Sequence, residues 1–300
     1  NVFWIHLQRN KDVLTNRLQT RSNHFMQSDM LLSQLQAYEE PKNGLIIDIN
    51  QNLETIIQTI KSSMSRIKTE IGIIGLGVMG TSLARNIASK NISISLYNRH
   101  VDGKEENIAK NAVDTFGELQ NALPFDDLEA FVQSLASPKK VFLMVNAGKP
   151  VDDIIQKLIP LLGDGDVIVD GGNSLYKDTS SRANLLTQHN ILYLGAGVSG
   201  GEEGALMGPS IMPGGDKKAF KVMEGIFQSI AAKNEHGEVC CAYIGEGGAG
   251  HFVKMVHNGI EYAEMQLIAE IYSHLRYDQD LTMEKIANIF EEWNQGDTAN

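Results

Sequence analysis

Four polar side chains recur at helical spacing in the last third of the sequence. Lys254, His257, Asn258 and Glu261 stand at positions i, i+3, i+4 and i+7, so a helix would place them on one face. A lysine beside histidine and asparagine can hold a substrate hydroxyl, and burial or a nearby cofactor cation would lower its pKa toward that of a general base. The same residues could instead form a solvated face stabilised by side-chain pairs. Two glycine-rich turns precede the helix and favour a ligand site.

A glycine fingerprint lies earlier in the chain. Gly75, Gly77 and Gly80 follow a strand-like run at 71–74 and precede a helical pattern at 82–89. In that context the first glycine permits a tight turn, the second lets a pyrophosphate approach the backbone, and the third packs helix against strand. The alternative is a glycine turn that binds nothing. The predicted cofactor residues here are Gly75, Leu76, Gly77, Val78, Met79 and Gly80.

The next strand ends in an arginine instead of a carboxylate. Its last residues are Tyr97-Asn98-Arg99-His100, about 20 residues after the glycines, where NAD-binding folds place Asp or Glu. Arginine can pair with the 2′-phosphate that a carboxylate would repel, so the sequence favours NADP. The alternative interpretation of Arg99 is an exposed loop residue.

Two further glycine clusters follow predicted strands. They are Asp170-Gly171-Gly172-Asn173-Ser174 and the segment 197–204. Both would lie at the carboxyl edge of a parallel sheet, where such folds bind ligands. Flexible connectors are the alternative, but close approach of the backbone to a ligand explains both clusters better.

These candidate residues require a parallel sheet to position them. Strand-like runs at 71–74, 92–97, 141–145, 167–170 and 191–194 alternate with helical patterns. The alternation predicts an α/β fold with a doubly wound, Rossmann-type parallel sheet. Helical patterns at 249–276 and 282–293 then begin an all-α domain. The predicted division is a partial α/β unit at 1–61, a linker at 62–69, a cofactor domain at 70–247 and a helical domain at 248–300.

Composition narrows the class of protein. The 300 residues carry 26 Lys and Arg against 37 Asp and Glu, a formal charge of −11, which argues against nucleic acid or an anionic membrane as the main partner. The only cysteines, Cys240 and Cys241, are adjacent, which excludes a disulfide framework and a cysteine-rich zinc site. No apolar stretch approaches a membrane span. We expect a cytoplasmic enzyme, and the ends at Asn1 and Asn300 suggest a piece of a longer reading frame.

Taken together, these motifs resemble the decarboxylating 6-phosphogluconate dehydrogenases over about residues 70–300. The segments that carry the resemblance are 74–80, 97–99, 170–173, 197–206, 208–215, 254–262 and Glu292-Trp293-Asn294. The resemblance implies oxidation of 6-phosphogluconate at C3 by NADP, loss of CO2 from the 3-keto acid, and release of ribulose 5-phosphate. It implies no metal, because a 3-keto acid is already an electron sink, and it implies a homodimer.

The resemblance also implies roles for individual residues. Lys254 would be the base and Glu261 the acid, with His257 and Asn258 orienting the substrate. Further substrate contacts would come from Asn173, Ser199, Gly200, Gly201 and Tyr262. Further cofactor contacts would come from Asn98, Arg99, Val145, Asn146, Ala147 and Asn173. The family usually has alanine at position 77 and lysine at position 146.

The first 61 residues resemble a different family, the C-terminal half of gluconate kinases. The resemblance rests on Arg17-Leu18, Arg21, His24-Phe25-Met26, Met30-Leu31, Ser33-Gln34, Asp48-Ile49-Asn50-Gln51 and Leu53-Glu54. It implies a P-loop-kinase-like α/β segment in which Arg17 and Arg21 lie near nucleotide phosphates, although surface arginines on a helix are the alternative. The sequence holds no GxxxxGK[ST] loop, so this segment alone could not phosphorylate a substrate. The implied parent is a fusion of gluconate kinase with the dehydrogenase.

Two other interpretations remain at this stage. One is a β-hydroxyacid dehydrogenase, such as one acting on 3-hydroxyisobutyrate, which shares the fold and the lysine but is not expected to carry Ile260-Glu261-Tyr262. The other is a non-catalytic binding module that keeps the dinucleotide site without turnover.

Overall fold

A seven-stranded sheet forms the centre of the computed structural model, which describes residues 5–8, 14, 45–64 and 68–295. The strands lie in the order β5-β4-β3-β6-β7-β8-β9. Their bounds are β3 Ile71–Ile74, β4 Ile94–Tyr97, β5 Leu123–Phe125, β6 Lys140–Leu143, β7 Val167–Asp170, β8 Leu192–Ser199 and β9 Ser210–Gly215. The helices are α4 Val78–Ser89, α5 Ile108–Thr115, α6 Leu128–Gln133, α7 Lys149–Leu158, α8 Tyr176–Thr187, α9 Gly201–Met207, α10 Lys217–Ile230, α11 Ala249–Ser273 and α12 Met283–Asn294.

Strands β3 to β8 are all parallel, which confirms the predicted Rossmann-type sheet. The exception is the edge strand β9, which pairs antiparallel with β8 and was not predicted. Only residues 200–209 separate these two strands, whereas a parallel crossover takes about a dozen residues or more. The short β5 at the other edge was also not predicted, because its Leu-Pro-Phe sequence lacks a strand pattern.

Strand β8 corrects the expectation of a glycine loop that starts at residue 197. The strand continues through Gly197 to Ser199, and the helix α9 begins at Gly201. Glycine weakened the strand pattern here, but its small size serves packing against α11. A Cβ on Gly197 would lie 2.5 Å from Cβ of Lys254, so a glycine is needed where helix and strand touch.

Apolar side chains cover both faces of the sheet. On β3, Ile71 and Ile73 join a core with α4, α5 and α10, while Ile74 joins a second core with α6, α7 and α8. Strand β7 divides in the same way, with Val167 and Val169 in the first core and Ile168 in the second. Burial on both faces explains why these strands read as continuous apolar runs without alternation.

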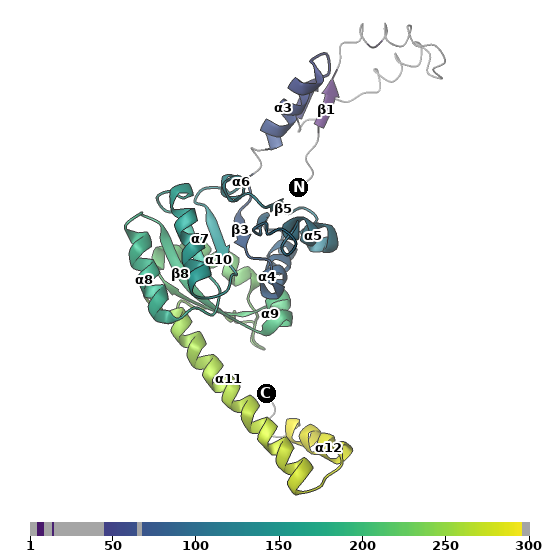
Figure 1. Ribbon diagram of the computed structural model, residues 1–300, viewed down its shortest axis with the longest axis vertical. Helices are drawn as coiled ribbons and strands as arrows, with labels where there is room; N and C mark the ends of the chain where they lie inside the picture. Colours follow the sequence, from purple (N-terminus) through teal and green to yellow (C-terminus); the bar gives the residue numbers. More distant parts are fainter. Residues whose placement is uncertain (1–4, 9–13, 15–44, 65–67, 296–300) are drawn as a thin grey trace, which may run out of the picture.

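A separate two-stranded unit precedes the main sheet (Figure 1). Strand β1 (Ile5–Gln8) pairs parallel with β2 (Leu45–Asp48), and α3 (Leu53–Met64) follows. The parallel pair and the helix after it are the elements expected of an α/β unit in this segment. The helix continues to Met64, three residues into the expected linker. Most of the kinase-like positions, Arg17 and Arg21 among them, lie outside the described residues.

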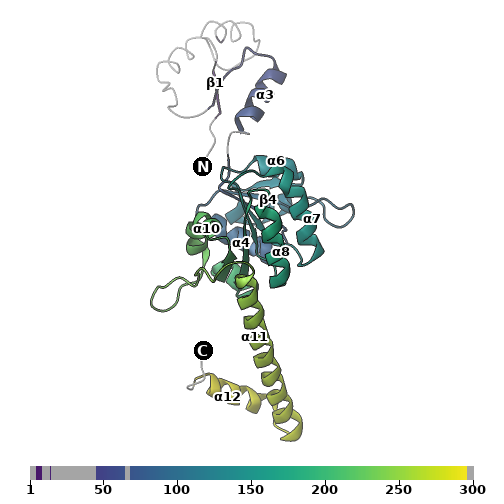
Figure 2. The ribbon, with the colours of Figure 1, turned by 90° about the vertical axis from the view of Figure 1, so that its left-hand side faces the viewer.

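Helix α11 leads away from the main sheet, and α12 folds back beside its far end (Figures 1 and 2). A π-helical turn at His274–Asp278 joins the two helices. Only Gly250, His251 and Lys254 of α11 are buried, all near its start. Farther along, large apolar side chains are exposed, including Ile260 and Leu267. Across the described ranges, no helix is both long and apolar enough to span a membrane.

Candidate functional site

A cleft of about 380 Å³ opens at the point where the strand order reverses, between β3 and its neighbours β4 and β6. Open α/β sheets bind ligands at this switch point, beyond the carboxyl ends of the strands. The structure brings seven of the predicted cofactor residues together in its lining. These are Gly75, Leu76, Gly77, Asn98, Arg99, Val145 and Asn146.

The three fingerprint glycines occupy three different environments. Gly75 has φ of +95°, the left-handed region, and a Cβ there would lie 2.5 Å from the backbone oxygen of Met144. A Cβ on Gly80 would collide with the Gly75 carbonyl oxygen, which shows how closely α4 packs on β3. Gly77 has no atom within 4 Å of its Cβ position and lies at the N-cap of α4. A ligand phosphate can therefore approach the helix N-terminus directly over Gly77.

Asn98 and Arg99 at the end of β4 both bond to a third residue, Glu105. Asn98 accepts a hydrogen bond from the Leu76 amide at 3.1 Å and donates to Glu105 at 2.9 Å. Arg99 donates to the same carboxylate from Nη2 at 2.8 Å and from Nε at 3.2 Å. These donors lower the pKa of Glu105, first through Arg99 and then through Asn98, so the carboxylate is ionised at neutral pH.

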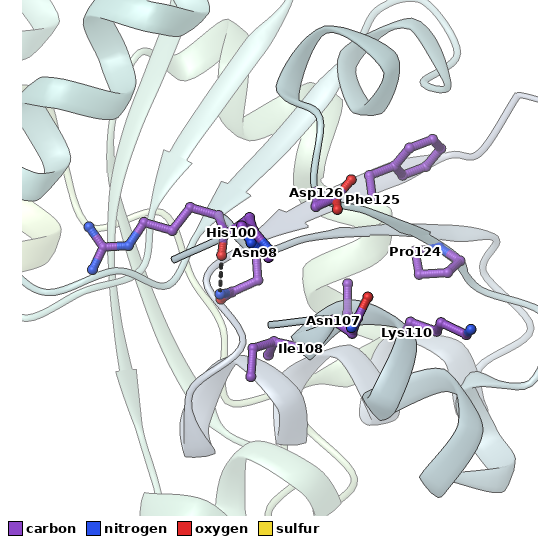
Figure 3. A pocket seen from close by; sticks show the side chains of 10 residues that line it. Asn98, His100, Asn107, Ile108, Lys110, Pro124, Phe125 and Asp126 are labelled. Carbon is purple, nitrogen blue, oxygen red and sulfur yellow. Dashed lines mark hydrogen bonds between the residues drawn. The ribbon is translucent and has the colours of Figure 1, made fainter. Parts of the chain in front are cut away.

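A second hollow of about 170 Å³ lies on the other side of β4 (Figure 3). Asn98 and His100 form one side of it, and Asn107 with Ile108 at the start of α5 forms another. Its remaining wall comes from β5 and the residue after it, Asp126. Asn98 and Arg99 line both hollows, so the end of β4 separates two adjoining spaces at one edge of the sheet.

A buried polar network holds the loops after β6 and β7. Arg182 on α8 donates to Asp152 at 2.7 Å, to the Gly148 carbonyl at 3.1 Å and to Asp170 at 3.4 Å. The Asp170 carboxylate is fully buried and also accepts from Ser174 at 2.6 Å and from the Gly172 amide at 3.1 Å. Because Arg182 pairs with Asp170, its charge is compensated in the interior. The glycine cluster after β7 is therefore a fixed turn rather than a flexible connector.

Tyr193 and His251 complete this network from the side of β8. The Tyr193 hydroxyl donates to Asp170 at 3.2 Å, and burial followed by the Asp170 charge raises its pKa well above the ordinary value. His251 at the start of α11 is 1% exposed and lies 2.7 Å from Thr179 on α8. Burial lowers the pKa of His251, so it is held as neutral imidazole. The start of α11 is thereby anchored to the sheet.

Lys254 lies one turn farther along α11 and is 7% exposed. The helix packs this closely on β8 and β9 because Gly250 has no side chain. A Cβ on Gly250 would collide with the carbonyl oxygens of Met212 and Gly195. Burial lowers the pKa of Lys254, and the charge of Glu261 opposes that shift. A lysine with this environment is a candidate proton acceptor.

The rest of the polar face of α11 gathers around the end of β8. Ser199 Oγ lies 3.1 Å from His257 Nε2, and His257 Nδ1 lies 3.5 Å from a Glu261 carboxylate oxygen. Asn258 Oδ1 lies 3.4 Å from the same Nδ1. The helical spacing therefore does place the predicted residues together on one face. Since β8 runs parallel to β3 in the sheet, Ser199 lies at the same sheet edge as the dinucleotide fingerprint.

The height of Ser199 above that edge follows from the strand register. Gly195 on β8 is level with Asp170, the last residue of β7, so Ser199 extends four residues farther. At about 3.3 Å per residue this is roughly 13 Å beyond the neighbouring strand end. The end of β8 that contacts the polar face therefore lies beyond the carboxyl edge of the neighbouring strand.

Several predicted site residues lie outside these contacts. Tyr262 is 69% exposed, and Asn173 is also exposed on the turn after β7. Gly200 and Gly201 both have positive φ, at 125° and 61°, where the chain turns into α9. The other predicted cofactor residues outside the cleft lining are Val78, Met79, Gly80, Ala147 and Asn173.

Sequence reasoning missed Glu105 and Arg182. Glu105 is brought back to β4 by a tight loop, and no spacing rule connects position 105 with position 99. Arg182 lies alone in a polar helix, with no pattern to mark it as buried. The one available signal for Arg182 was the Asp170 motif, because a buried carboxylate requires a cationic partner elsewhere in the chain. In the described part of the chain, no three His, Cys, Asp or Glu side chains gather as a metal site would need.

Comparison with known proteins gives the family. Residues 70–245 match the NAD binding domain of 6-phosphogluconate dehydrogenase, and residues 250–300 match the C-terminal domain of the same enzyme. The decarboxylating 6-phosphogluconate dehydrogenase of Bacillus licheniformis is 55% identical over 230 residues, which are 77% of this chain and 48% of that protein. An NAD(+)-dependent, decarboxylating 6-phosphogluconate dehydrogenase of Bacillus subtilis is 54% identical over 227 residues, 76% of this chain and 47% of the relative. The chain spans about half the length of these relatives.

Solved structures agree with this assignment. The 6-phosphogluconate dehydrogenase of Plasmodium falciparum, studied in its apo form, with NADP+ and with 6-phosphogluconate, superposes with a TM-score of 0.70 at 37% identity, covering 76% of this chain and 48% of that one. A 3-hydroxyisobutyrate dehydrogenase of Mycobacterium tuberculosis matches with a TM-score of 0.61 at 20% identity over 77% of this chain and 72% of its own, which shows a shared fold. The chain belongs to the 6-phosphogluconate dehydrogenase family.

Proposed function

We propose that the protein containing this chain oxidises and decarboxylates 6-phosphogluconate to ribulose 5-phosphate and CO2, with NADP as the hydride acceptor. The observation that carries the proposal is the buried Lys254 on the polar face of α11, above the edge of a dinucleotide-binding sheet. Family membership supports the substrate, since a relative has been solved with 6-phosphogluconate. The cofactor domain is proposed at 70–247 and the helical domain at 248–300.

The residues present fit a dinucleotide. The cleft combines the bare backbone at Gly77, the N-terminus of α4 and the cation of Arg99. Backbone amides and the helix dipole suit the pyrophosphate, and the guanidinium suits a 2′-phosphate. A bound NADP would supply the site with a hydride acceptor. Position 146 is asparagine where the family usually has lysine, so the cleft has one cation fewer. Arg99 would therefore balance more of the negative charge of the cofactor phosphates.

Proton chemistry in the proposed reaction belongs to α11. Neutral Lys254 would accept the proton of the C3 hydroxyl as the C3 hydrogen leaves as hydride, giving a 3-keto acid. The resulting ammonium would then donate to the C3 oxygen while the C1–C2 bond breaks and CO2 departs. Glu261 would protonate the carbon of the enediol that carried the carboxylate. Burial of the lysine favours its neutral form, which the first step requires.

His257, Asn258 and Ser199 would position the substrate. The contact between Ser199 and His257 fixes the imidazole between β8 and Glu261. Asn173, Gly200, Gly201 and Tyr262 are proposed as further substrate contacts from the family resemblance, and all four are exposed. The active protein is proposed to be a cytoplasmic homodimer without a metal requirement.

A second activity is proposed for the parent protein, the phosphorylation of gluconate with ATP. It is supported by the kinase-like residues in the first 61 positions and by the parallel pairing of β1 with β2 before α3. The product of that reaction would be the substrate of the dehydrogenase. The activity is tested by incubating the whole protein with gluconate and ATP and measuring ADP and 6-phosphogluconate.

The dehydrogenase is tested by incubating the whole protein with 6-phosphogluconate and NADP. Equimolar formation of reduced cofactor, CO2 and ribulose 5-phosphate is the expected result. Binding of NADP without turnover would instead support the binding-module alternative. Reduction without CO2 on another hydroxy acid would favour a β-hydroxyacid dehydrogenase.

A further inference from the structure

Glu105 places a carboxylate at the end of β4, although the strand itself ends in Asn98 and Arg99 and carries no acidic residue there. The placement depends on a tight loop in which Val101 and Glu105 exchange two backbone hydrogen bonds, of 2.9 and 2.8 Å. Gly103 at the tip has φ of +68°, and its amide donates to Glu106 at 2.6 Å. The loop therefore returns the chain to β4 in a defined geometry.

This arrangement gives one site two opposite charges. A carboxylate at the end of the second strand accepts a hydrogen bond from the ribose 2′-hydroxyl of NAD, whereas an arginine pairs with the 2′-phosphate of NADP. Glu105 and Arg99 both line the cleft and contact each other at 2.8 Å. A 2′-phosphate on Arg99 would compete with Glu105 for the same guanidinium donors.

The ion pair between Arg99 and Glu105 is weak enough for a ligand phosphate to replace Glu105 on the guanidinium. Arg99 is 71% exposed and Glu105 is 34% exposed, so water and salt screen their attraction. Releasing Arg99 to a phosphate therefore costs little, but the nearby carboxylate still repels that phosphate. Asn98 keeps Glu105 in place through its own 2.9 Å hydrogen bond, so the carboxylate stays near the ribose when Arg99 turns away.

We propose that Glu105 sets the balance between NAD and NADP, by accepting the 2′-hydroxyl of NAD and by opposing the 2′-phosphate of NADP on Arg99. The inference rests on the proposed dinucleotide site and adds the residue that limits its preference for NADP. With both charges present, the protein binds both cofactors. Removing the carboxylate leaves Arg99 free and shifts the balance to NADP.

The test is isothermal titration of the whole protein with NADP and with NAD. Three forms are compared: wild type, Glu105→Gln and Glu106→Gln. The Glu106 change removes the same charge from the same loop, but Glu106 contacts the Gly103 amide instead of Arg99. For Glu105→Gln we expect NADP affinity to rise about tenfold while NAD affinity falls about two- to threefold. The control variant should change the ratio of the two affinities less than about twofold.

The outcomes separate this inference from the proposed function. Equal changes in both affinities for Glu105→Gln, or a control variant that shifts the ratio as much, would overturn the role of Glu105 and leave the dinucleotide site intact. Failure of wild type to bind either dinucleotide would overturn the proposed function and this inference with it. Repeating the titrations at high salt adds a check, since screening should shrink the effect of Glu105→Gln.

Discussion

The dinucleotide cleft and the polar face of α11 are built in contrasting ways. The cleft lies at the ends of the buried strands β3, β4 and β6, whose main-chain turns form much of its wall beside residues of α7. The polar face depends on side chains of one helix, which is buried only at Gly250, His251 and Lys254 and is half-buried or exposed over the rest of its length. Beyond Lys254, the face touches the sheet at Ser199.

This difference indicates a division of labour. Backbone geometry that is fixed by packing is suited to binding a cofactor, since its amides need no rotamer to be chosen. Side chains on a helix are suited to moving protons, because burial can tune each pKa separately. Substitutions on α11 should therefore remove turnover without loss of cofactor binding. Substitutions in the cleft should weaken cofactor binding and leave kcat at saturating cofactor close to wild type.

The largest effect is expected from Lys254→Met, which keeps the length of the side chain and removes its amine. Loss of the general base should lower kcat by about 10²- to 10⁴-fold. Affinity for NADP should stay within about threefold of wild type, because Lys254 does not line the cleft. Steady-state kinetics and titration of NADP measure the two effects on one preparation.

Lys285 on α12 provides a matched control, because it is exposed and lies on a different helix. Lys285→Met should leave kcat unchanged. Near-normal turnover in Lys254→Met, or equal loss of binding and turnover, would remove the assigned base and the division of labour with it.

The next largest effect is expected from Arg99→Met. Loss of the guanidinium should weaken NADP by about ten- to a hundredfold and NAD far less, because only NADP carries the 2′-phosphate. At saturating NADP, kcat should stay close to wild type. Competition binding against both cofactors measures the ratio, and equal weakening of NADP and NAD would exclude Arg99 as the phosphate ligand.

A smaller effect distinguishes two glycines of the fingerprint. Gly80→Ala should lower the free energy of unfolding by about 1–3 kcal/mol, since its Cβ would collide with the Gly75 carbonyl oxygen. Gly77→Ala should change it by no more than about 1 kcal/mol, because its Cβ position has no neighbour within 4 Å. Urea unfolding measures both free energies of unfolding, and equal m-values for the two variants allow them to be compared. The reverse ranking would contradict the described packing of α4 on β3.

The smallest effect is a shift in the pH profile of Glu261→Gln, a variant that also loses turnover because Glu261 is the proposed acid. The Glu261 charge raises the pKa of Lys254, so its removal should lower that pKa further. Neutral lysine is then present at lower pH, and the acidic limb of kcat/KM should move to lower pH on top of a reduced maximum. Glu270→Gln, farther along α11, should leave the limb in place. A limb that stays in place or moves to higher pH would contradict the effect of Glu261 on Lys254.

The sequence was informative wherever function depends on local spacing. The fingerprint glycines, the strands at 71–74 and 167–170, and the single face shared by Lys254 and Glu261 follow from short-range patterns, and the structure has them. Expectations about secondary structure failed where the conformation depends on contacts with distant segments of the chain. The glycines of β8 read as a loop because the helix that packs on them lies some 50 residues away.

Long-range charge pairing was equally hidden. Glu105 reaches Arg99 through a loop whose geometry no spacing rule predicts, and Arg182 on α8 is buried by partners on three other segments. Neither residue stands out as a motif in the chain. The contact of Glu105 with Arg99 and the fixed geometry of the loops after β6 and β7 therefore came from the structure alone.

The most direct test of the proposed reaction uses 6-phosphogluconate carrying deuterium at C3, with the whole protein and NADP. Oxidation at C3 predicts that each turnover moves one deuterium to the reduced cofactor and releases one CO2 from C1. Mass spectrometry of the cofactor and trapping of CO2 measure both quantities in one reaction. Unlabelled reduced cofactor, or labelled cofactor without CO2, would contradict the account.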